Sequence, residues 1–137
     1  MTEPLRLAPA PLFLSTFKSR LGTVVLLEDR LAFVAPKRRA GAAFGAIGML
    51  LTQRSATNAA PARAAEGGDG VTTVPLAELQ AIERGTQGLN KDVLVVRGPA
   101  TELKLGVRYD EWAPAIERAA IAAGRRSTVG DDRIEFA

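Results

Sequence analysis

The chain has 137 residues, enough for one domain, and 47% of them are apolar, so it can bury a hydrophobic core. It contains no cysteine and no histidine, which excludes disulfides, thiolate metal sites and histidine-based catalytic triads. The net charge of +3 is uneven: residues 1–70 hold nine basic and five acidic side chains, whereas residues 71–137 hold nine and ten. This excess is smaller than nucleic-acid-binding proteins usually carry, so no nucleic-acid partner is expected.

The first 12 residues contain three prolines and predict an irregular lead. They lack the continuous apolar run of a signal peptide, and no later segment reaches the ~20 apolar residues of a spanning helix. A cytoplasmic protein is therefore expected, with peripheral association at the inner membrane face as an open alternative. Residues 13–21 could form a strand or a short helix. They alternate, with Phe13 and Phe17 on one face and Lys18 and Arg20 on the other, which favours a strand.

Residues 22–36, GTVVLLEDRLAFVAP, predict a β-hairpin around which the rest of the chain is arranged. Two runs of β-branched and aromatic residues flank the acidic pair Glu28-Asp29, where the chain reverses. Residues 37–70 then form an insertion. Its first part, residues 40–51, is apolar and glycine-spaced, and residues 52–70 are small and polar, which predicts a flexible loop.

Strand patterns resume at Val71 and continue to Val107. We expect strands through Val74 with a kink at Pro75, at residues 81–84, at residues 92–97 and at residues 102–107, with a turn at residues 85–91. Antiparallel neighbours are expected because the connections are short.

A single amphipathic helix is expected near the C-terminus, beginning at Asp110 as N-cap and ending at Gly124. Trp112 and Ile116, followed by Ala119, Ala120 and Ala123, form an apolar stripe that would pack on the sheet. Residues 125–137 are expected to be a loose tail, although residues 133–136 could add to a sheet edge. The predicted fold class is mainly β with one C-terminal α-helix: a bent antiparallel sheet or partly open barrel, capped by the helix.

This order of segments resembles the pleckstrin-homology-like (PH-like) superfamily, of the GRAM or bacterial PH kind. The segments that carry the resemblance are GTVVLLEDRLAFV, TTVPLAELQAIERG, and VLVVRG with ELKLGV leading into DEWAPAIERAA. It covers residues 13–124 as one domain, interrupted by residues 37–70. The chain departs from the family pattern at Leu27, where threonine is common, at Glu78, where aspartate is common, and in the length of the insertion.

Basic residues near the first strands are the first candidate site. In PH domains that hold inositol phosphates such residues form the phosphate cradle, so the resemblance implies Lys18 and Arg20, with Arg30 or Lys37, as headgroup ligands. The alternative is that these side chains form a solvated strand edge.

The insertion is the second candidate site. Lys37, Arg38 and Arg39 precede an apolar run in which Phe44, Ile47 and Leu51 share a helical face; Met49 and Leu50 belong to the same run. Three interpretations remain open: contact with an anionic membrane, close approach of two copies through glycine-spaced helices, or packing on the chain's own barrel.

Paired acidic residues at 28–29, 110–111 and 131–132 are candidate catalytic groups, but none has a base, nucleophile or phosphate loop beside it. No catalytic residue, metal or cofactor is therefore predicted. The sequence favours a non-catalytic adaptor or scaffold that forms homo-oligomers and binds a protein or the inner membrane surface, with a lipid-headgroup-binding module as the alternative.

Overall fold

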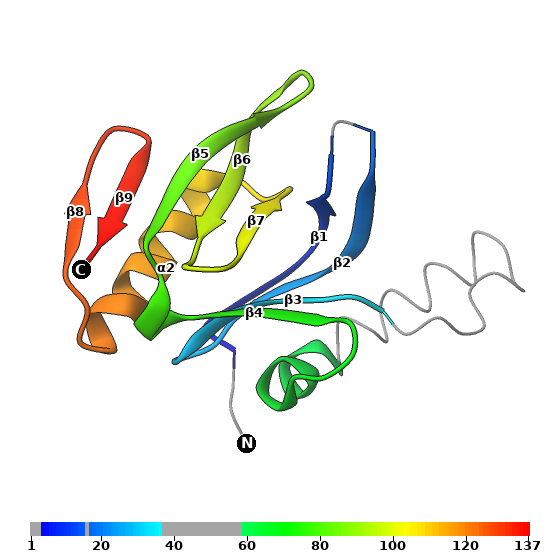
Figure 1. Ribbon diagram of the computed structural model, residues 1–137, viewed down its shortest axis with the longest axis horizontal. Coiled ribbons are helices and arrows are strands. Elements are labelled where there is room, and N and C mark those ends of the chain that lie inside the picture. The colour runs from blue at the N-terminus through cyan, green and yellow to red at the C-terminus, as the bar shows by residue number, and fades with distance from the viewer. Residues whose placement is uncertain (1–3, 16, 37–58) are drawn as a thin grey trace, which may run out of the picture.

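The computed structural model describes residues 4–15, 17–36 and 59–137 (Figure 1). Nine antiparallel strands in these ranges form one sheet in the order β4-β3-β2-β1-β7-β6-β5-β9-β8. They are β1 (Arg6–Phe13), β2 (Ser19–Leu26), β3 (Arg30–Val34), β4 (Val71–Pro75), β5 (Ala81–Gln87), β6 (Asn90–Arg97), β7 (Glu102–Leu105), β8 (Ser127–Val129) and β9 (Arg133–Phe136). β4 and β8 remain as the two ends of this order, so the sheet is not closed. Helix α2 (Tyr109–Ala122) follows β7, and the predicted fold class is confirmed.

The predicted hairpin is present as β2 and β3, with the chain reversing at residues 27–29. Leu27 N–H donates to the Arg30 carbonyl at 2.8 Å and closes this turn. Residues 22–26 of β2 and residues 31–34 of β3 are all buried, on both faces of the sheet. This explains why the two apolar runs are continuous and do not alternate.

The prediction of an irregular lead at residues 1–12 is wrong from Arg6 onward, where β1 pairs with β2 over eight residue pairs. The Pro11 carbonyl accepts from Gly106 N–H, so the backbone at residue 11, and at residue 9 two positions before it, faces β7. On that side β1 pairs only at Leu12 with Leu105. Pro9 and Pro11 therefore lack an N–H group on the side that faces β7. The hydrogen bonds between β1 and β2 are unaffected, so the two prolines cost little stability.

The predicted continuous strand at residues 13–21 is also wrong. Phe13 ends β1, residues 19–21 begin β2, and the described residues between them, 14–15 and 17–18, belong to the turn. Leu14 N–H and Ser15 N–H both donate to the Lys18 carbonyl, and Lys18 N–H donates to Ser15 Oγ. Side-chain capping of this kind by serine stabilises turns and competes with extended structure.

A helix at residues 59–66 covers the outer face of the first half of the sheet, where a flexible loop was predicted for residues 52–70. Ala60 and Ala64 are fully buried there. They pack in a second hydrophobic cluster with sheet residues Val25, Leu27, Ala32 and Val34. Alanine side chains let the helix lie close to the sheet, and their low hydrophobicity concealed the helix in the sequence pattern.

The second half of the sheet agrees with the predicted strands. β4 ends at Pro75, a short 3-10 helix, η2 (Leu76–Glu78), follows, and β5 begins at Ala81. β5 runs to Gln87, beyond its predicted end, and the turn to β6 shortens to residues 88–89. Leu103, Leu105 and Val107 are buried, as the alternation predicted.

Helix α2 packs against β5, β6 and η2 and closes the main core. Trp112 and Ile116 are buried, as predicted, and Ala119 and Ala120 continue the buried stripe, but Ala123 is the exposed C-cap. The helix ends before Gly124, whose φ of 92° suits glycine. Its N-cap is Arg108, not Asp110, because Asp110 already lies in the first turn.

The C-terminal residues are not a loose tail: β8 and β9 form a hairpin, and β9 pairs with β5. The predicted alternative, that residues 133–136 add to a sheet edge, is confirmed. Ile134 and Phe136 are buried in the main core. Arg125 ties the segment to η2, because its guanidinium donates to the Leu76 and Leu79 carbonyls.

Candidate functional site

The turn between β1 and β2, together with the start of β2, carries the basic residues predicted as headgroup ligands. Lys18 precedes β2 and Arg20 lies within it, and both side chains are exposed. They line the same open depression, of about 940 Å³, with Leu14, Phe17, Ser19, Leu21, Ala35, Pro36 and Gly70. The structure therefore brings these two predicted residues together.

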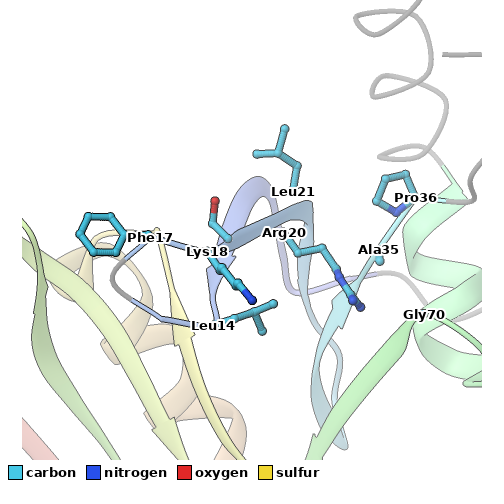
Figure 2. A pocket seen from close by; sticks show the side chains of 9 residues that line it. Leu14, Phe17, Lys18, Arg20, Leu21, Ala35, Pro36 and Gly70 are labelled. Carbon is cyan, nitrogen blue, oxygen red and sulfur yellow. The ribbon is translucent and has the colours of Figure 1, made fainter. Parts of the chain in front are cut away.

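Figure 2 shows how the side chains of this depression lie. Arg20 extends toward Ala35 and Gly70, Lys18 lies beside Leu14, and Phe17 points outward. Phe17 is 96% exposed, and Leu14 and Leu21 are more than half exposed. Three apolar side chains in water, interleaved with two cations, are unusual for a surface turn.

The sequence argument missed these apolar residues because it placed residues 13–21 on a strand. On that reading Phe13 and Phe17 share a face that points into the core. Phe13 is half-buried in β1, whereas Phe17 stands at the tip of the turn. The signal that could have revealed the turn is Ser15-Thr16, since serine and threonine favour turns.

Arg30 does not join Lys18 and Arg20. It begins β3, whereas the depression lies beyond the other end of that strand, at Ala35 and Pro36; about 16 Å of extended chain separates them. The Arg30 guanidinium pairs with Asp29 at 2.9 Å and donates to the Ala64 and Ala65 carbonyls, so it holds helix 59–66. The hydrogen bond from Arg30 lowers the pKa of Asp29.

The other predicted contact residues lie outside the described ranges. These are Lys37, Arg38 and Arg39, predicted for headgroups, and Phe44, Ile47, Met49, Leu50 and Leu51, predicted for a membrane or a second copy. Their roles stay predictions. Lys37 directly follows Pro36, a residue of the depression's rim, in the sequence.

Among the paired acidic residues at 28–29, 110–111 and 131–132, ion pairs are formed by Asp29, Asp110, Glu111 and Asp132. Arg84 of β5 binds Asp92 of β6 at 2.8 Å, Asp110 of α2 at 2.6 Å and Asp132 of the β8–β9 turn at 2.8 Å. Its guanidinium also lies 4.9 Å from the centroid of the Tyr109 ring. One guanidinium thus joins two strands, the helix and the C-terminal hairpin. In the described part of the chain, no acidic cluster is arranged to hold a metal ion.

Acidification should weaken this cluster. The hydrogen bond from Arg84 holds the pKa of Asp110 below its usual 3.8, so the ionised carboxylate contributes stability that is lost as the pH falls through the lowered pKa. We expect urea midpoints to fall below about pH 4. The Arg84→Met variant should unfold at a lower urea concentration at neutral pH, and its urea midpoint should decrease less as the pH falls.

The carboxylate of Glu83 should titrate alike in the native protein and in this variant. Its partial burial raises its pKa, but Arg97 and Arg133 outweigh this and lower the value. Parallel pH profiles for the two proteins would contradict the prediction.

Comparisons with known proteins identify the fold but no family. No family model matches the chain, and no curated protein matches it. The crystal structure of the C-terminal domain of an unknown protein from Leishmania infantum is similar, with a TM-score of 0.53 and 8% identity over 88% of this chain and 85% of that one. A chain in the ternary complex between human RhoA, its inhibitor and the DH/PH domain of human ARHGEF11 gives a TM-score of 0.52 and 14% identity. That match covers 88% of this chain and 29% of the other.

These identities support a statement about fold alone: the bent, open sheet followed by a helix is consistent with a PH-like architecture. Among the helices in the described ranges, none is both long and apolar enough to cross a membrane.

Proposed function

We propose that this protein is a non-catalytic PH-like adaptor, of the GRAM or bacterial PH kind, that attaches to an anionic membrane surface through the turn between β1 and β2. The observation that carries the proposal is the placement of exposed Phe17 beside Lys18 and Arg20 at one depression. Residues 14–21 contain no acidic side chain. Cations would meet lipid phosphates and carboxylates while apolar side chains enter the headgroup region.

The expected strength of this attachment is modest. A lysine or arginine near an anionic leaflet contributes about 1 kcal/mol, so Lys18 and Arg20 together contribute about 2 kcal/mol. Lys37, Arg38 and Arg39, which follow Pro36 in the sequence, would add about 3 kcal/mol if they reach the same surface. Stable attachment therefore depends on several weak contacts acting together.

Self-association is the second part of the proposal. The apolar, glycine-spaced residues 40–51 would join copies of the chain, and joined copies bind a membrane more strongly because their weak sites act at once. The proposed adaptor would then gather protein partners at the inner membrane face.

Reversing the two charges tests the membrane site. Lys18→Glu with Arg20→Glu should lower the partition onto vesicles that contain phosphatidylserine at least about tenfold, because it removes two contributions of about 1 kcal/mol each. Co-sedimentation with vesicles measures the partition, and higher salt should weaken the binding of the native protein.

The matched control is Arg118→Glu with Arg126→Glu, which changes the net charge equally at exposed positions on and after α2. It should pellet nearly like the native protein. Equal losses for both double variants would indicate a general charge effect, and no loss for the first would remove the β1–β2 turn from the proposal.

A further inference from the structure

A second turn carries a fully exposed leucine. β5 and β6 are joined by Gly88 and Leu89, and the Leu89 side chain is 100% exposed. Gly88 has a φ of 58°, which supplies the positive φ that a two-residue hairpin turn requires at its first position. The backbone makes no such demand for an apolar side chain at residue 89. Exposure to water does not favour a leucine side chain at this position either, because burial, not exposure, stabilises apolar surface.

This turn lies next to the β1–β2 turn. Gln87, the last residue of β5, donates from Nε2 to the Ser15 carbonyl at 3.0 Å. A smaller depression, of about 370 Å³, lies between the two turns, and Phe13, Leu14, Ser15, Gln87, Glu102 and Lys104 line it. Figure 1 shows the β5–β6 and β1–β2 ends projecting at the same side of the molecule.

The charges around the two turns have one sign. Residues 14–21 and 86–91 include Lys18, Arg20 and Lys91 and no aspartate or glutamate. The nearest acidic groups are already engaged: Glu102, in the smaller depression, pairs with Arg97 at 2.9 Å, and Asp92, after Lys91, pairs with Arg84 and Arg108. An anionic surface is the occupant that this charge distribution complements.

We propose that Phe17 and Leu89 enter one anionic lipid surface together, as the apolar tips of two adjoining turns, with Lys18, Arg20 and Lys91 around them. This inference rests on the proposed membrane function and adds a second turn to it. Two contacts restrict the orientation of the molecule on the membrane more than one turn alone does. The β1–β2 and β5–β6 turns would face the lipid, and the start of β1, at the other end of that strand, would lie away from it (Figure 1).

The absence of cysteine allows a direct test, because one introduced cysteine can be labelled alone. Phe17→Cys, Leu89→Cys and, as a control, Leu5→Cys would each carry the environment-sensitive fluorophore NBD. Leu5 is 53% exposed and precedes β1, at the opposite end of that strand from the β1–β2 turn. With vesicles containing phosphatidylserine, labels at 17 and 89 should shift to the blue and resist reduction by dithionite, and the label at 5 should do neither.

The outcomes separate the two proposals. Protection at 17 without protection at 89 would overturn the two-turn inference and leave the membrane function standing. Protection at neither position in a protein that still pellets would overturn the inference and move the membrane contact elsewhere. If the native protein does not pellet with these vesicles, the proposed function itself fails.

An unlabelled variant checks that the fluorophore does not create the binding. Leu89→Ser should lower the vesicle partition at least about threefold, because leucine, unlike serine, gains from entering the acyl boundary. The leucine touches nothing in the fold, so the variant should remain folded. Leu5→Ser is the control, because Leu5 is an exposed leucine at the opposite end of β1, and it should bind like the native protein. A Leu89→Ser protein that binds equally well would overturn the inference.

Discussion

Replacement of Trp112 by alanine is expected to lower the free energy of unfolding by about 3–5 kcal/mol, the usual cost of removing a buried aromatic side chain. Trp112 is 2% exposed and projects from α2 into the main core. The guanidinium of Arg6 also lies 5.3 Å from the centroid of its ring, so β1 and α2 meet there. The loss would reach both the first strand and the last helix.

Chemical unfolding followed by circular dichroism measures this effect, since the variant lacks the chain's one tryptophan fluorophore. Ile121→Ala is the control on the same helix, because Ile121 is 50% exposed. It should change the stability by no more than about 0.5 kcal/mol. A change below about 1 kcal/mol for Trp112→Ala would mean that α2 does not close the core.

Replacement of Phe136 by alanine is expected to cost about 3 kcal/mol, although the residue is the last but one in the sequence. Its side chain is 9% exposed and belongs to the main core. Its N–H donates to the Gln80 carbonyl at 2.9 Å, so β9 is fixed beside the start of β5. Thermal or urea unfolding measures the effect.

Val129→Ala on the same hairpin is the matched control, because Val129 is 63% exposed. It should leave the midpoint nearly unchanged. If Phe136→Ala behaves like this control, the C-terminal hairpin contributes little to the fold.

The strands and the helix with strong apolar patterns were predictable from the sequence. β2 and β3 have continuous β-branched runs, β7 alternates, and the stripe from Trp112 to Ala120 has helical spacing. In each case the residues that form the pattern are buried in the structure. Burial of these apolar side chains stabilises each element, so their spacing in the sequence predicts the element.

The elements that were missed, or in the case of β9 predicted only as an alternative, have weak local signals and depend on partners far away in the chain. β1 contains Pro9 and Pro11, and only its position between β2 and β7 makes them tolerable. β9 is four residues long and is stabilised by pairing with β5, 50 positions earlier in the case of Arg133 and Glu83. Helix 59–66 is apolar only through alanine.

The basic residues of the candidate site were predicted from the sequence, and its exposed apolar residues were not. The charges of Lys18 and Arg20 are visible in any sequence, and the structure places them together. The exposure of Phe17 and Leu89 was not predicted, because an apolar residue in a sequence is usually expected to be buried. Leu89 lay inside a segment correctly assigned as a turn, and an apolar residue at a turn is the signal that could have been used.

Arg63, in helix 59–66, joins the two ends of the segment that separates β3 from β4. Its guanidinium donates to the Ala35 carbonyl on one side and to the Asp69 carbonyl on the other. The chain leaves the sheet after β3 and returns to it at β4, and Arg63 holds these two points together. Their separation therefore does not depend on residues 37–58. A change in the length of residues 37–58 would therefore leave the Arg63 contacts and the pairing of β3 with β4 in place. This position would accept a grafted peptide or a small inserted domain without loss of the sheet.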